Sequence, residues 1–229
     1  ATSDLGFGVS DSAAVAVSVT QANDTPSIND MTDDSEFTEA FGITVAGPAV
    51  VMDAKTGTFV PASLSDVDLT LRQETTFNGA RLVVRAGQIA DGDTNLDPND
   101  FFLPQTAGGI ALVGSLTEVG PGVEVYANGS VVQYNGTVVG TITQNSLGTG
   151  KLVITFNASA DKAAVDALLQ NMSFSNKTAN LTMGVKPLTV CFYDGNGSAN
   201  NNQGTGGELV GCATVSMSMT PRNDAPLFS

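Results

Sequence analysis

The sequence predicts a mainly β, antiparallel chain with one inserted α-helix, and three observations support this. Between residues 109 and 156, short apolar and β-branched runs alternate with Gly and Asn, which is typical of antiparallel strands joined by turns. Residues 210–220 alternate apolar with small or polar side chains, as a strand with one buried face does. Helical spacing of apolar residues is convincing only between Ala160 and Met172.

The elements follow in order along the chain. Between Ile28 and Leu71 acidic residues interrupt the apolar runs, so we expect a short β pairing followed by a loop. Residues 88–104 are predicted to form a polar excursion, and residues 194–207 a long loop rich in Gly and Asn. Asn-Gly pairs at 128–129 and 135–136 predict turns. The expected strands are Arg81–Arg85, Ile110–Val113, Val123–Tyr126, Val131–Tyr134, Thr137–Thr143, Leu152–Phe156, Leu188–Tyr193 and Val210–Thr220.

The inserted helix is predicted over Ala160–Met172. Ser159 has a side-chain oxygen that suits an N-cap, and Asp161 places a negative charge near the positive end of the helix dipole. A single apolar stripe follows the helical period and is expected to pack in the core; it consists of Ala164, Val165, Leu168, Leu169 and Met172.

Composition excludes several functional classes. The 229 residues include 23 acidic and 9 basic ones, and this formal charge of -14 opposes nucleic-acid binding and suits either calcium-loaded acidic clusters or simple solubility. The chain contains no histidine, which excludes His-based zinc sites and triads, so we expect no enzyme. No apolar run can span a bilayer, so no membrane insertion is expected. The first residues lack signal-peptide features, and we expect a soluble mature chain or an excised segment.

The two cysteines are predicted to pair. Cys191 and Cys212 each lie on the face of a predicted strand opposite its apolar residues, so both thiols point the same way. In an oxidising compartment a disulfide across the hairpin is the natural outcome, and two buried free thiols are the alternative.

A long-range repeat divides the chain. Asn23-Asp24-Thr25-Pro26 returns 200 residues later as Asn223-Asp224-Ala225-Pro226, and the alternating residues 13–20 lie in register with residues 213–220. We therefore expect residues 1–24 to be the C-terminal strands of a preceding repeat, or an exchanged hairpin. Residues 25–228 are expected to form one long repeat.

These motifs resemble a known family. Residues 222–228 are similar to the linker of cadherin repeats and, more closely, to the repeat ends of bacterial cadherin-like and RTX-type surface adhesins. Further matches are residues 65–68, residues 152–157 leading into 163–169, and residues 188–197. The resemblance implies a cadherin/Ig-like antiparallel β-sandwich with one inserted α-helix. It also implies Ca2+ between consecutive domains, head-to-tail neighbours of the same kind, and an extracellular location, on the bacterial surface or secreted.

Candidate calcium ligands follow from the residues and the resemblance together. In the extended run 65–68, Asp66 and Asp68 place two carboxylates on one side, about 6 to 7 Å apart by strand rise, so both reach one hard cation. The resemblance gathers Asn23, Asp24 and Glu39 around the same cluster, and makes Asn223 and Asp224 half a site that the next repeat completes.

A second set of oxygen ligands lies in the acidic excursion. Asp91, Asp93, Asn95 and Asp97 stand at every second position, which fits either a calcium loop or a solvated acidic turn. An EF-hand is not expected, because Leu96 takes the place of the required Gly and no helices flank the loop. Asp194 opens a further loop that resembles a calcium-binding turn.

Three functions are compatible with these features. The first is a calcium-rigidified repeat of a bacterial adhesin or filament, a spacer with a cell-adhesion role that also contacts a surface glycan or protein receptor. The second is a filament subunit that polymerises by exchange of the strands in residues 1–22. The third is a carbohydrate-binding module using Tyr126 and Tyr134, although the lack of Trp leaves few stacking platforms.

Overall fold

The computed structural model describes a mainly β chain with one α-helix. It covers residues 22–29, 31, 35–40, 43–44, 52–53, 58–59, 62–66, 77–94, 96–120, 123–177, 183–196 and 205–220. Within this part of the chain no helix is long and apolar enough to cross a membrane. The predicted strands of a preceding repeat, before Ala22, lie outside the described residues.

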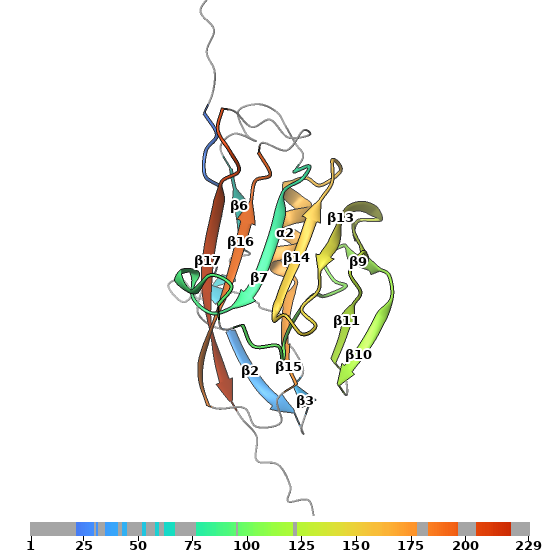
Figure 1. Cartoon of the computed structure of the whole chain (residues 1–229), viewed down its shortest axis with the longest axis vertical. Helices are drawn as coiled ribbons and strands as arrows, with labels where there is room; N and C mark the ends of the chain where they lie inside the picture. The colour runs from blue at the N-terminus through green and yellow to red at the C-terminus, as the bar shows by residue number, and fades with distance from the viewer. Residues whose placement is uncertain are drawn as a thin grey trace, which may run out of the picture.

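A nine-stranded sheet forms the larger layer. All its neighbouring strands are antiparallel except β17 and β2, which run parallel. Figure 1 shows β17, β16, β7, β14 and β13 side by side along the long axis of the molecule. In spatial order the strands are β3 (Ile43–Thr44), β2 (Ser35–Ala40), β17 (Val210–Thr220), β16 (Gly184–Tyr193), β7 (Arg81–Ala86), β14 (Lys151–Phe156), β13 (Thr137–Gln144), β12 (Val131–Tyr134) and β9 (Ile110–Val113).

A second layer covers one face of this sheet, and Figure 1 shows its helix behind β7 and β14. It contains two antiparallel ribbons and the helix, namely β1 (Ser27–Asn29) with β6 (Ser63–Ser65), β8 (Asp100–Pro104) with β15 (Met172–Asn176), and α2 (Lys162–Gln170). Leu64, Phe102 and Leu168 from this layer belong to the same buried cluster as the sheet residues Leu82 and Ile154. The predicted fold class, an antiparallel β-sandwich with one inserted helix, is therefore confirmed.

Strand alternation explains which face is buried. Along β14, Leu152, Ile154 and Phe156 are buried while the residues between them are partly exposed. Because successive side chains on a strand point to opposite faces, these residues all face the second layer. The outer face of the sheet carries the polar alternates of the same strands and the two cysteines.

Two further ribbons complete the described strands: β10 (Leu116–Gly120) with β11 (Val123–Tyr126), and β4 (Met52–Asp53) with β5 (Thr58–Phe59). The predicted turn at Asn128-Gly129 connects β11 to β12, which do not pair, because β11 pairs with β10 instead. At Asn135-Gly136 both residues have positive φ, 48° and 80°, and they form a two-residue hairpin between β12 and β13.

The predicted polar excursion is wrong at its C-terminal end. A 3-10 turn, η1 (Ile89–Asp91), begins the excursion, but Asp100–Pro104 forms the strand β8. Phe101 and Phe102 are both 1% exposed, so this segment belongs to the core. Burial of two adjacent aromatic residues outweighs the acidic residues that precede them.

The helix is shorter than predicted. It spans Lys162–Gln170, and its N-cap is Asp161, whose side chain accepts a hydrogen bond from the Ala164 amide at 2.9 Å. The expectation that Ser159 caps the helix is wrong, because Asp161 is the residue whose extended backbone and carboxylate meet the free amides. The predicted stripe is buried as expected, although Met172 reaches the core as the first residue of β15.

Candidate functional site

Residues 22–26 contain the first Asn-Asp-x-Pro motif and are called the linker below; in them, Asn23 is hydrogen-bonded to a distant part of the described chain. The backbone N–H of Asn23 donates a hydrogen bond to the Thr205 carbonyl at 3.1 Å, and the preceding residue, Ala22, forms a parallel β-bridge with Thr205. The side-chain Nδ2 of Asn23 donates to Asp194 Oδ2 at 2.7 Å and to the Gly207 carbonyl at 2.9 Å. The linker is therefore bound to the loop between β16 and β17, which lies 171 residues further along the chain.

Asp194 organises this end of the sandwich. The residue is 0% exposed, and its Oδ1 accepts hydrogen bonds from the Asn196 amide at 2.9 Å and the Leu209 amide at 3.1 Å. The same carboxylate thus closes the loop and binds the linker. The next residue must be glycine, because Gly195 has φ 74° and a Cβ there would lie 2.6 Å from the backbone nitrogen of Ala80.

Asp66 lies at the same end. The β1–β6 pairing ends with Ser27 opposite Ser65, so one more residue along both strands places Pro26 opposite Asp66. Asp66 is 6% exposed, whereas Asp24 is exposed. A Cβ on Gly211 would fall 1.8 Å from the Pro26 carbonyl oxygen, so the linker runs directly against the start of β17. The structure thus brings Asn23, Asp24, Asp66 and Asp194 to one end of the molecule; we name this group the linker-end cluster.

Glu39 is not part of this cluster, contrary to the prediction. Its strand β2 pairs with the last residues of β17, where Thr38 lies opposite Thr220, while the linker lies beside Gly211. At about 3.3 Å per residue this separates the two by about 30 Å along β17. Figure 1 shows β2 near the opposite end of the long axis from the blue linker segment.

The structure does not describe four of the predicted calcium ligands. Asp68, Asn95, Asn223 and Asp224 lie outside the described residues. Residues missed by sequence reasoning are Asn196 and Gly207, which contribute a backbone amide and a carbonyl to the cluster. Repetition of the linker singled out Asn23, but only the fold identifies its partners.

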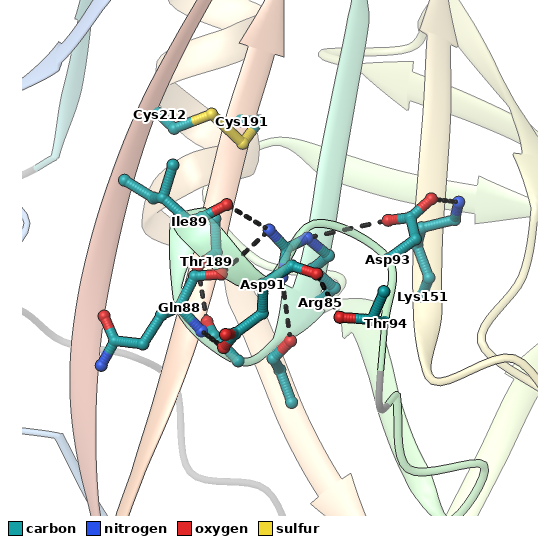
Figure 2. A network of polar contacts seen from close by, with 12 residues as sticks. Arg85, Gln88, Ile89, Asp91, Asp93, Thr94, Lys151, Thr189, Cys191 and Cys212 are labelled. Carbon is teal, nitrogen blue, oxygen red and sulfur yellow. Dashed lines mark hydrogen bonds and ion pairs between the residues drawn. A yellow bond between two sulfur atoms is a disulfide. The ribbon is translucent and has the colours of Figure 1, made fainter.

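The acidic excursion uses its carboxylates for internal contacts, which Figure 2 shows. Arg85, 5% exposed on the outer face of β7, donates to the carbonyls of Gln88 and Ile89 at 3.1 and 3.3 Å. Asp93 forms ion pairs with Lys151 at 2.5 Å and with Arg85 at 3.7 Å, and Asp91 Oδ2 accepts from the Gln88 amide at 2.8 Å.

Asp97 is engaged in the same way. Its Oδ1 accepts from the Asn99 amide at 2.9 Å, and its Oδ2 lies 3.7 Å from the Lys186 Nζ. The carboxylates of the excursion therefore serve as turn caps and ion-pair partners that fold it over the sheet. The spacing of oxygen-bearing side chains at every second position, from Asp91 to Asp97, is compatible both with these turn and ion-pair contacts and with a calcium loop.

Cys191 and Cys212 are a cross-strand pair. They lie directly opposite each other in the β16–β17 ladder, with their sulfur atoms 2.06 Å apart, which is the distance of a disulfide. Cys191 is on the outer face, next to the excursion, and Thr189 on that face donates to the Gly87 carbonyl at 2.6 Å.

Reduction of this disulfide should lower the free energy of unfolding by about 2 to 4 kcal/mol, because it removes a constraint on the unfolded chain. Urea denaturation with and without reductant measures the effect, and the Cys191→Ser, Cys212→Ser double variant should match the reduced protein and not respond to reductant. Equal midpoints for oxidised and reduced wild-type protein would contradict the prediction.

The two tyrosines considered for carbohydrate binding lie at the edge of the core. Tyr126 and Tyr134 are partly buried and pack against the core cluster. Among the residues described, no group of three or more His, Cys, Asp or Glu side chains is arranged to hold a metal ion. No family model, curated protein or solved structure matches this chain significantly. In the part of the chain that is described, fold and site together define a β-sandwich with one helix in which the segment around Asn23 docks onto the connection between β16 and β17.

Proposed function

We propose that this chain is a calcium-rigidified repeat of a bacterial surface adhesin or extracellular filament, acting as a structural spacer with a cell-adhesion role. The observation that supports this most strongly is the docking of the linker residue Asn23 onto the buried Asp194. A spacer must transmit orientation from one domain to the next, and a linker bonded to the following domain does so.

The chemistry of the linker-end cluster fits calcium. Asp24, Asp66 and Asp194 carry carboxylate oxygens, the kind of hard ligand that calcium takes six to eight at a time. Because the described residues by themselves do not arrange three such groups around one ion, the proposed site also needs Asp68. Carboxylates that converge repel one another, and a divalent cation converts this repulsion into a rigid joint. The Asn23 side chain points its nitrogen at Asp194, so its role is to hold that carboxylate in place. Asp68 would complete the set, two residues beyond Asp66.

The 200-residue spacing of the two Asn-Asp motifs extends the proposal to a head-to-tail array of repeats. Asn223 and Asp224 stand in the sequence where Asn23 and Asp24 stand one period earlier. In the proposed array they dock onto the last loop of the next domain as Asn23 docks here. The partners are then identical or similar repeats, head to tail, and a receptor or glycan at the cell surface.

Small-angle scattering with and without calcium tests this proposal. The wild-type chain should become stiffer when calcium is added, and Asp66→Ala with Asp68→Ala should abolish the change. A matched control is Glu118→Ala with Glu124→Ala, which removes the same charge from the exposed β10–β11 ribbon. If the linker-end double variant stiffens as much as wild type and the control, the junction is not the calcium site.

A further inference from the structure

A lysine, an asparagine and an aspartate meet between the two layers. Asp100 in β8 lies directly opposite Asn176 in β15, and Lys186 comes from β16 in the large sheet. Asp100 Oδ1 accepts hydrogen bonds from Lys186 Nζ at 2.5 Å and from Asn176 Nδ2 at 2.7 Å. Both nitrogens donate hydrogen bonds to the same oxygen atom, so the amine of Lys186 and the carboxamide of Asn176 are neighbours.

The carboxylate and the carboxamide of this group are buried, and the Lys186 side chain is 23% exposed. Asp100 is 0% exposed and Asn176 1%, and the Lys186 Nζ lies 5.4 Å from the centroid of the Phe174 ring. That ring packs on Phe102 with centroids 5.5 Å apart. The second carboxylate oxygen, Asp100 Oδ2, is buried and has no hydrogen-bond partner in the part of the chain that is described.

Burial favours the neutral form of Asp100. Desolvation raises the pKa of Asp100 above its usual value, against the lowering effect of Lys186 and the hydrogen bond from Asn176, and the nearby Asp97 raises it further. The reaction proposed below uses Lys186 as an amine, and Asp100 is the group that its Nζ contacts directly. A neutral amine is the nucleophilic form of lysine.

We propose that Lys186 and Asn176 form an intramolecular isopeptide bond, with Asp100 as the acid–base residue. The lone pair of Nζ attacks Cγ of Asn176, so a Cγ–Nζ bond forms and the Cγ–Nδ2 bond breaks. Asp100 takes the proton that Nζ loses and gives a proton to Nδ2, which leaves as ammonia. The carboxyl group is regenerated, and no oxidant, metal or cofactor is required.

The fixed positions of the three side chains should increase the rate of this reaction. Amide exchange between lysine and asparagine is slow in solution, and holding both groups against one acid–base side chain replaces a bimolecular encounter by an intramolecular one. An ion pair would need only Lys186 and Asp100. The third member, Asn176, shares Asp100 Oδ1 with the amine and adds the electrophilic carbon that the cross-link requires.

The bond would join the layers of the sandwich. Asn176 belongs to the covering layer and Lys186 to the nine-stranded sheet, so the cross-link would tie one to the other independently of the disulfide, which lies within the sheet. This inference stands apart from the calcium proposal, because neither the reaction nor its test involves a metal.

Intact mass spectrometry of the denatured, reduced wild-type protein tests the inference. The mass should be lower than the sequence mass by one ammonia, and proteolysis should yield one branched peptide that contains both Lys186 and Asn176. Lys186→Arg and Asp100→Asn should each restore the full mass of the variant. Lys177→Arg is the matched control, since Lys177 adjoins Asn176 in sequence but contacts the Phe101 ring, and it should keep the ammonia loss.

Two results would overturn the proposal. One is a wild-type mass equal to the sequence mass with separate peptides, a result that does not depend on any variant folding. The other is an ammonia loss that persists in Lys186→Arg, which would assign it to succinimide formation at an Asn-Gly pair such as 128–129. The branched peptide distinguishes the two origins directly.

Discussion

Replacing Phe192 with alanine should lower the free energy of unfolding by about 4 kcal/mol, within the range for a large aromatic side chain lost from a core. Phe192 is 0% exposed on the inner face of β16. Its ring meets Phe77 edge-on with centroids 5.1 Å apart and lies 6.1 Å from Phe156. The truncation therefore leaves a cavity that borders both rings. Urea denaturation monitored by circular dichroism measures the change.

The adjacent residue provides the control. Tyr193 follows Phe192 in β16 but faces the other side of the sheet, where its ring lies 4.6 Å from the Arg81 guanidinium carbon. Tyr193→Ala should cost only about 1 kcal/mol, the scale of an exposed cation–π contact. If the two variants lose equal stability, the assignment of the buried face of β16 is wrong.

Replacing Asp194 with alanine should cost about 3 kcal/mol in calcium-free, chelator-containing buffer. The change removes a fully buried carboxylate and leaves three donors without it: the Asn23 side chain and the amides of Asn196 and Leu209. Buried donors that lose a charged acceptor carry most of this cost. Thermal unfolding followed by calorimetry gives the value.

Asp194→Asn is the matched variant for this site. It keeps an acceptor oxygen and the shape of the side chain, so it should retain more stability than Asp194→Ala while losing the charge-assisted part of the Asn23 contact. A loss below about 0.5 kcal/mol for Asp194→Ala, the usual range for a surface substitution, would contradict the role given to this residue.

Sequence patterns predicted the sheet well because its strands have one polar and one apolar face. The alternation in residues 210–220 marked β17 at its observed limits, and the Asn135-Gly136 pair marked the β12–β13 hairpin. The facing of the two cysteines followed from the same alternation. These signals are local, and the structure preserves them.

The covering layer was less predictable because it depends on partners distant in sequence. Asp100–Pro104 follows an acidic loop, and its partner β15 begins directly after the helix. Neither segment therefore had a sequence pattern that predicted a strand. The turn at Asn128-Gly129 is present, but its flanking strands pair elsewhere: β11 pairs with β10, and β12 pairs with β9 and β13. Asp161 displaced Ser159 as the helix cap because capping depends on the exact backbone position, which composition does not give.

The candidate site was predicted in part. Repetition of the linker singled out Asn23 and Asp24, and the run 65–68 singled out Asp66, which the β1–β6 pairing brings to the same end. Glu39 was misplaced because its position depends on the parallel pairing of β2 with the end of β17, which no local pattern records. The central role of Asp194 and the meeting of Asp100, Asn176 and Lys186 depend on contacts across the whole chain, which no local pattern records.

Calorimetric titration of calcium into the chelator-treated wild-type chain, paired with thermal unfolding, tests the central claim most directly. Calcium should bind with saturable heat at or below millimolar concentration and raise the unfolding temperature, since a ligand that binds only the folded state stabilises it. Magnesium at the same concentration serves as the control and should have a smaller effect. No heat of binding at millimolar calcium, together with an unfolding temperature that chelator leaves unchanged, would contradict the account.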